Sequence, residues 1–180
     1  MNDDETDTCG CGNKGCLEQY ASATGIVRMA KKKLATETRA TKLTTFDPLT
    51  AKDIFDVAKE NDEVALELVD VLCTMLGTAL ANVAAVADPE IFVIGGGVSR
   101  AGDILIQGIQ KKFEEKAFHA CRGTGISLAT LGNDAGMYGC VGVLKMSRFV
   151  PATSCYAATG FCFSWFYFAY FSGACGQELC

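Results

Sequence analysis

The chain has 180 residues, of which 49% are hydrophobic and 21% charged, a composition typical of a folded globular domain. Its formal net charge of −5 argues against a nucleic-acid-binding protein, because surfaces that bind phosphate backbones are usually basic. The acidic N-terminal residues form neither a cationic segment nor an apolar one, so we expect no signal peptide and a cytoplasmic protein.

The first distinctive stretch is a cluster of three cysteines, Cys9, Cys11 and Cys16, with three glycines between them. Zinc takes four ligands in a tetrahedron, and the glycines allow the sharp backbone curl that would direct three thiolates to one centre. The spacing favours a metal site whose fourth ligand lies elsewhere, with a reactive or disulfide-forming cluster as the alternative. Glu18 follows two residues later, where a carboxylate could bind substrate hydroxyls or simply favour a helix N-terminus.

Helical periodicity dominates the next part of the chain. Apolar residues three and four apart predict a helix over 17–34, and a polar stretch over 36–49 predicts a loop. A capping-box pattern at Thr50 predicts a short helix through residue 60. A long helix is predicted from residue 61 or 62 to about 86, and its apolar second half should be buried.

The second half of the domain alternates strands with helices. Ile91–Ile94 is a short apolar run typical of a buried strand. A helix is predicted over 101–120, a strand over 126–131 and a glycine-rich helix over 135–145. This order predicts an α/β fold, in which ligands bind at the carboxyl ends of strands.

Three glycines, Gly95, Gly96 and Gly97, follow the first predicted strand directly. Such a turn could contact a nucleotide through exposed backbone amides, or it could be a tight packing turn. The single histidine, His119, is more typical of a surface side chain at a helix end than of the missing metal ligand. The two candidate sites are therefore the cysteine cluster with Glu18 and the glycine turn.

The composition changes near residue 147. Residues 147–180 hold four of the ten cysteines and ten of the seventeen aromatic residues, but only two charged residues, Arg148 and Glu178. We therefore divide the chain into a domain over 1–146 and an atypical hydrophobic, Cys- and aromatic-rich tail over 147–180. An abnormal end, such as a shifted reading frame, explains the tail better than a membrane span, because Pro151 and the lack of a cationic flank disfavour a span. A genuine packing extension is the third alternative.

Three motifs can now be read together: Cys9-x-Cys11-Gly-x-x-Gly-Cys16-Leu-Glu18, Asp88-Pro-Glu-Ile-Phe-Val-Ile-Gly-Gly-Gly-Val-Ser99 and Leu131-Gly-Asn-Asp-Ala-Gly136. They resemble the ROK family (repressors, open reading frames and sugar kinases), and most closely its bacterial-type glucokinases. The resemblance covers about residues 9–145. It implies the actin-like/RNase H-like sugar-kinase fold, of which this chain would be an incomplete C-terminal lobe.

The resemblance also implies roles for the candidate residues. The three cysteines would be ligands of a structural zinc, and Glu18 would hydrogen-bond the hydroxyls of the sugar. The three glycines would lie beside ATP, which the family uses with magnesium as its co-substrate. The implied activity is that of a hexose kinase of glycolysis, which converts glucose and ATP to glucose 6-phosphate.

Some motifs of the family have no match in this sequence. They are its phosphate-binding loops, its catalytic aspartate and the histidine that supplies the fourth zinc ligand. We therefore expect the chain alone to be inactive and its zinc binding to be weakened. The alternatives are a sugar-sensing ROK repressor module and a non-catalytic zinc-stabilised interaction domain. The expected partners are a hexose, with glucose first, and ATP, without nucleic acid; a homo-oligomer and membrane contact by the tail stay open.

Overall fold

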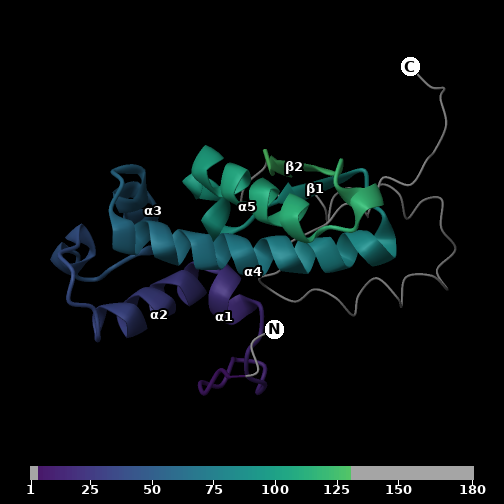
Figure 1. Ribbon diagram of the computed structural model, residues 1–180. Coiled ribbons are helices and arrows are strands. Elements are labelled where there is room, and N and C mark those ends of the chain that lie inside the picture. Colours follow the sequence, from purple (N-terminus) through teal and green to yellow (C-terminus); the bar gives the residue numbers. More distant parts are fainter. Residues whose placement is uncertain (1–3, 131–180) are drawn as a thin grey trace, which may run out of the picture.

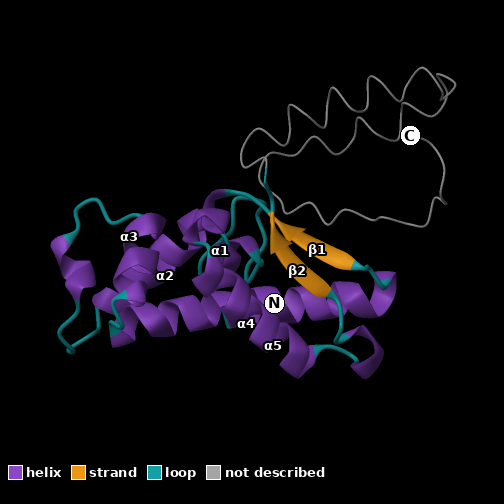
Figure 2. Cartoon of the chain, turned by 90° about the horizontal axis from the view of Figure 1, so that it is seen from above, coloured by secondary structure: helices purple, strands orange, loops and turns teal. Residues whose placement is uncertain are grey.

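The computed structural model describes residues 4–130, and its elements are arranged around one long helix (Figure 1). This helix, α4 (Glu63–Ala87), has two N-terminal helices on one side, and on the other side lie a further helix and a two-stranded sheet (Figure 2). A fourth short helix lies near the N-terminal end of α4. The helices are α1 (Glu18–Ala21), α2 (Ala23–Leu34), α3 (Ala51–Lys59), α4 (Glu63–Ala87) and α5 (Asp103–Lys116), and the strands are β1 (Ile91–Ile94) and β2 (Gly125–Leu128).

Helix α4 confirms the predicted long helix almost to the residue. Asp62 caps it by accepting a hydrogen bond from the Ala65 amide at 3.1 Å. Its apolar stripe is buried, and Leu72 and Leu76 are among the largest fully enclosed side chains of the described residues. The helix ends at Ala87, and the residue that caps this end, Asp88, has a left-handed backbone (φ 43°) and precedes a proline. By length and composition α4 could cross a membrane, but more than half of its most apolar stretch is buried against other elements, as in a core helix.

The single helix predicted over 17–34 is wrong, because the chain breaks at Ser22. Ser22 has an extended backbone (φ −100°, ψ 165°), and its hydroxyl accepts a hydrogen bond from the Gly25 amide at 2.9 Å while donating to the Glu18 carbonyl at 2.7 Å. This hydroxyl therefore ends α1 and begins α2. A Cβ on Gly25 would lie 2.5 Å from the Glu18 carbonyl oxygen, so only glycine lets the two helices approach this closely.

Helix α3 begins as predicted. The Thr50 hydroxyl accepts from the Asp53 amide at 3.3 Å, and the Asp53 carboxylate accepts from the Thr50 amide at 2.9 Å. This capping box satisfies two amides that a helix end leaves without partners. The segment predicted as a loop over 36–49 contains a short 3-10 turn, Lys42–Thr45.

The strands β1 and β2 are parallel, and α5 connects them, which confirms an α/β arrangement in the described residues. Helix α5 is shorter than predicted, because 3-10 turns occupy Gly97–Ala101 before it and His119–Cys121 after it. Two glycines bring α4 and α5 together: a Cβ on Gly77 would lie 2.8 Å from the Lys112 Cβ, and one on Gly108 would lie 2.6 Å from the Cys73 Sγ. The predicted helix over 135–145 and the tail over 147–180 lie outside the described residues.

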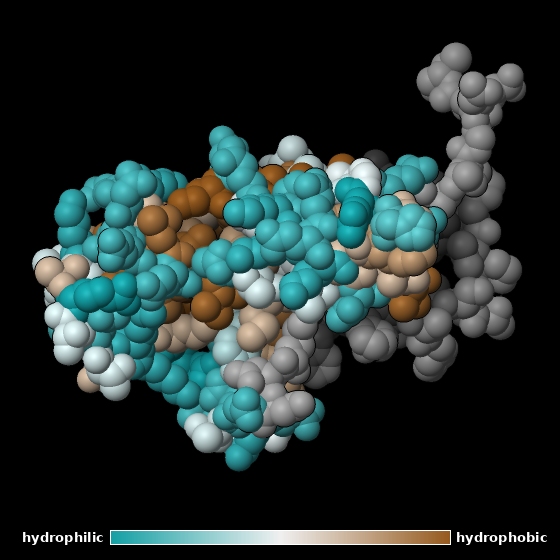
Figure 3. Space-filling model, viewed as in Figure 1, coloured by the Kyte–Doolittle hydropathy of each residue, from teal (hydrophilic) through white to brown (hydrophobic). Residues whose placement is uncertain are grey.

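The surface is not uniformly polar. Figure 3 shows apolar areas on one face, surrounded by hydrophilic side chains. Along α4, Leu66, Val71, Val83 and Val86 are all exposed, and Val86 is 90% exposed. Single apolar side chains exposed in this way are common on protein surfaces.

Candidate functional site

The three cysteines at the N-terminal end lie together, as their spacing predicts. The sulfurs of Cys9, Cys11 and Cys16 all lie within 4.8 Å of one another, and the last two are 3.4 Å apart. The loop is closed by the Cys9 amide, which donates to the Asn13 carbonyl at 2.7 Å, and it turns through Gly12, whose φ is +88°. A left-handed backbone of this kind strongly favours glycine.

This arrangement fits a zinc ion by its donors and its dimensions. Two thiolates bound to one tetrahedral zinc at ~2.3 Å lie about 3.8 Å apart, close to the spacing of these sulfurs. His119 takes no part in the cluster: it is exposed, and its ring lies 4.2 Å from the Phe118 ring, measured between centroids. The prediction that this histidine is a surface residue is confirmed, although it lies in a 3-10 turn and not at the end of a helix.

The thiols differ in their proton affinity. The backbone amide of Asn13 and the neighbouring Cys16 and Cys9 thiols lower the pKa of Cys11. The hydrogen bond with Cys11, followed by desolvation, raises the pKa of Cys16 to about 11. Because metals bind thiolates, binding of an ion by the loop would release protons.

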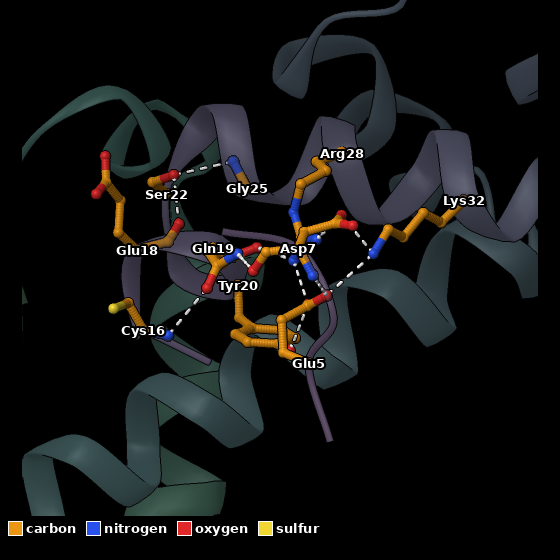
Figure 4. Close-up of polar contacts among 10 residues, drawn as sticks. All are labelled: Glu5, Asp7, Cys16, Glu18, Gln19, Tyr20, Ser22, Gly25, Arg28 and Lys32. Atoms are coloured by element: carbon orange, nitrogen blue, oxygen red, sulfur yellow. Dashed lines mark hydrogen bonds and ion pairs between the residues drawn. The ribbon is translucent and has the colours of Figure 1, made fainter. Parts of the chain in front are cut away.

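Glu18 is the first residue of α1 and lies next to the cysteine loop. Cys9 Sγ donates to its carboxylate at 3.4 Å. The side chain is half-buried, and Figure 4 shows it directed away from the ionic contacts around Asp7 and Glu5. The structure thus places a carboxylate at the edge of the cysteine loop, where it can accept hydrogen bonds.

The predicted glycine turn follows β1, at the carboxyl end of the strand. Gly96 has a φ of +84° and is exposed, and a Cβ at that position would meet nothing within 4 Å. A Cβ on Gly97, in contrast, would lie 3.1 Å from the Cβ of Ala23, the first residue of α2. The turn therefore combines exposed backbone with close packing, and it contacts the start of the helix that follows Glu18.

Sequence reasoning missed a polar network behind the cysteine loop (Figure 4). Arg28 on α2 bonds Glu5 at 2.8 Å and Asp7 at 2.7 Å, and Lys32, one turn later, bonds the same two carboxylates. Arg28 and the Tyr20 hydroxyl hold the pKa of the Glu5 carboxyl well below its usual range. The sequence signal was the spacing of two acids at 5 and 7 and two bases four residues apart on one helix face.

A sequence model of the ROK family matches residues 1–146. The glucokinase of Halalkalibacterium halodurans is 45% identical over 135 residues, which are 73% of this chain and 41% of that protein. The xylose repressor of Caldicellulosiruptor bescii is 27% identical over 78% of this chain and 36% of that protein.

Among solved structures, the ROK family glucokinase of Streptomyces griseus, in complex with glucose and AMPPNP, is similar with a TM-score of 0.64 and 37% identity. The similarity covers 73% of this chain and 45% of that one. The chain thus spans less than half the length of these relatives. Because the family's sequence model matches far more than half of its residues, the chain belongs to the ROK family.

Proposed function

We propose that this chain forms the sugar-binding and nucleotide-contacting part of an ATP-dependent hexose kinase, with glucose as its sugar. The observation that carries the proposal is the position of Glu18, whose carboxylate lies 3.4 Å from Cys9 Sγ at the edge of the cysteine loop. An ionised carboxylate accepts several hydrogen bonds, which suits the adjacent hydroxyls of a hexose. The similar glucokinase of Streptomyces griseus, solved with glucose and AMPPNP, supports this choice of ligands.

Zinc would stabilise the loop from which Glu18 extends. Cys9, Cys11 and Cys16 would hold the ion, and it would supply a cross-link between segments too short to form a core of their own. A rigid loop keeps the carboxylate in one place and lowers the entropy lost when a sugar binds.

The glycine turn would meet the nucleotide. Gly96 leaves its backbone exposed, so a phosphate or ribose can approach without meeting a side chain. Because Gly97 packs on Ala23, the turn lies beside the helix pair that presents Glu18. We therefore propose that sugar and nucleotide bind on the same side of this lobe.

We further propose that the 180-residue chain binds sugar without phosphorylating it. Phosphoryl transfer requires groups that grip the phosphates and a base that orients the attacking hydroxyl. By resemblance to the family, we expect this sequence to lack counterparts of the phosphate loops and of the catalytic aspartate.

A sugar-sensing module is the second candidate, and the similarity to the xylose repressor favours it. The two functions differ in the nucleotide. A kinase lobe binds an ATP analogue, and its sugar and nucleotide sites influence each other, whereas a sensing module needs only the sugar.

Isothermal titration calorimetry tests both proposals. Glucose, xylose and AMPPNP are titrated separately into the purified chain and into its Glu18→Gln variant, with Glu115→Gln, which alters an exposed carboxylate on α5, as the matched control. A hydrogen bond to a charged group contributes ~1.5–3 kcal/mol, so Glu18→Gln should weaken glucose binding about tenfold or more.

Equal glucose affinity in wild type and Glu18→Gln would refute the proposed role of Glu18. Binding of xylose without any binding of AMPPNP would favour the sensing module. A coupled assay with glucose and ATP completes the test, because turnover by the chain alone would contradict the proposal that it binds without phosphorylating.

A further inference from the structure

One buried side chain is bonded to both ends of the cysteine loop. Gln19, on α1, is only 6% exposed. Its amide nitrogen donates to the Asp7 carbonyl at 3.0 Å, just before the loop, and its amide oxygen accepts from the Cys16 amide at 3.0 Å, at the end of the loop (Figure 4). Gln19 thus fixes the separation of the two ends without touching a sulfur.

Arg28 fixes Gln19 and the segment that precedes the loop. Its guanidinium donates to the Asp7 carboxylate at 2.7 Å and to the Glu5 carboxylate at 2.8 Å. It also donates to the Gln19 carbonyl at 3.1 Å and lies 5.6 Å from the centre of the Tyr20 ring. The planar guanidinium of arginine donates several hydrogen bonds in a fork of fixed geometry, which the single ammonium group of lysine cannot reproduce.

The bonds of Gln19 and Arg28 affect the positions of the cysteine sulfurs. Cys9 lies two residues after Asp7, which both side chains hold, and Cys16 is bonded directly through its amide. Two other bonds join the loop to α1: Cys9 Sγ donates to the Glu18 carboxylate at 3.4 Å, and the Gln19 amide donates to the Cys16 carbonyl at 3.0 Å. The bond from the Cys9 amide to the Asn13 carbonyl is local to the loop. The side chains of Gln19 and Arg28 add the contacts that hold the segment before the loop, and so they help to set where the first and last sulfurs lie relative to Glu18.

We propose that Gln19 and Arg28 are positioning residues for the metal loop: they bring the Cys9 and Cys16 sulfurs into the arrangement that binds zinc and hold Glu18 beside them. This inference rests on the proposed zinc site. It assigns a function to a polar network that otherwise would be only an ionic contact between the N-terminal segment and α2. Residues of this kind, which support ligands from behind, change metal affinity although they never touch the ion.

Substitutions by residues of similar shape remove particular hydrogen bonds of the network while keeping others. In Gln19→Glu, the side chain still accepts from the Cys16 amide but cannot donate to the Asp7 carbonyl. In Arg28→Lys, the charge stays but the fork is lost, whereas Arg28→Met removes both. Gln107→Glu on α5 is the matched control, because Gln107 is exposed and far from the loop in the sequence.

Cobalt(II) is the probe, because its bond to thiolates gives a charge-transfer absorption that reports the number and geometry of sulfur ligands. We expect Gln19→Glu and Arg28→Met to weaken cobalt binding by about tenfold or more and to alter the spectrum. Arg28→Lys should lie between Arg28→Met and wild type, and Gln107→Glu should match wild type. The far-UV circular dichroism of each metal-free variant should match that of the metal-free wild-type chain. Arg28→Met should unfold at a lower temperature with its helices intact before unfolding, because it removes an ion pair from the largely buried Glu5 carboxylate.

Each of three other results would refute either the proposed zinc site or the positioning role. If wild type binds no cobalt through thiolates, the proposed zinc site is wrong and this inference falls with it. If wild type binds cobalt and the variants bind it equally well, the zinc site stands and the positioning role is refuted. If the metal-free variants of both residues lose helical structure as they lose cobalt, the two residues only support the fold, and the positioning role is again refuted.

Discussion

Gly25→Ala tests the contact on which the position of Glu18 depends. The new Cβ would lie 2.5 Å from the Glu18 carbonyl oxygen and 2.8 Å from the Gln19 carbonyl oxygen. Both atoms belong to the backbone of α1, so no side-chain rotation can make room. The α1 backbone would have to withdraw by about 0.9 Å, from 2.5 Å to 3.4 Å, to restore an ordinary van der Waals contact.

Two opposing effects determine how much Gly25→Ala changes the free energy of unfolding. Alanine is favoured over glycine inside a helix by about 1 kcal/mol, but overpacking of this kind costs about 1–3 kcal/mol. The shift also strains the two hydrogen bonds through which Ser22 joins α1 to α2. We therefore expect Gly25→Ala to lower the free energy of unfolding by about 1–2 kcal/mol, equivalent to a fall of roughly 2–8 °C in Tm for a chain of this size.

Urea denaturation followed by far-UV circular dichroism measures this change, with Gly123→Ala as the control. A Cβ on Gly123 would meet nothing within 4 Å, so that variant should be neutral or slightly more stable, because alanine restricts the unfolded chain. If Gly25→Ala were as stable as wild type or more stable, the close approach of α1 and α2 would be wrong. The position inferred for Glu18 would then be wrong with it.

Three further predictions concern a cap, an ionic cluster and a metal ligand. Thr50→Ala removes the capping box of α3 and should cost about 1 kcal/mol in urea unfolding. Arg39 lowers the pKa of both Glu37 and Glu67 from 4.5 to about 2, so the unfolded chain binds more protons between these values, and the free energy of unfolding should fall as the pH falls from about 4.5 towards about 2. Cys16→Ser should weaken the cobalt–thiolate absorption by about one third, because one of three thiolates is lost.

Each of the three has a control. For the cap, Thr38→Ala alters an exposed threonine outside any helix and should be neutral. For the ionic cluster, the metal-free chain is used so that metal release does not add to the effect of pH. In this chain, Arg39→Met should make the free energy of unfolding fall less steeply between pH 4.5 and about 2. An unchanged dependence on pH would contradict the role given to Arg39. For the metal, Cys121→Ser, in a buried cysteine outside the cluster, should leave the cobalt absorption unchanged. An equal loss in both cysteine variants would refute the assignment of the ligands.

The sequence predicts those elements that local patterns determine. Helix α4 follows from an apolar stripe and a cap at Asp62, and β1 from a short apolar run before glycines. The proximity of the three cysteines also follows from local spacing, since only six residues lie between the positions of the first and the last of them, the middle cysteine included. In these regions, neighbouring residues alone decide the structure.

What the sequence does not predict depends on contacts between distant residues. The periodicity over 17–34 is helical throughout, and only the crossing of two backbones at Gly25 explains why Ser22 breaks it. The bonds of Arg28 to Glu5 and Asp7 join residues more than twenty positions apart. The spacing of the acids and of the two bases on α2 is visible in the sequence, but which of them pair depends on how α2 folds against the N-terminal segment.

The central claim is that a metal-bound cysteine loop holds Glu18 where a hexose binds. The most direct test is the affinity for glucose of one preparation, measured by calorimetry in the zinc-loaded chain, after removal of zinc with a chelator, and after zinc is added back. We predict that glucose binding is weakened about tenfold or more without zinc and is restored with it, and that Glu18→Gln binds weakly in all three states. An affinity for glucose that is the same with and without zinc would contradict the account.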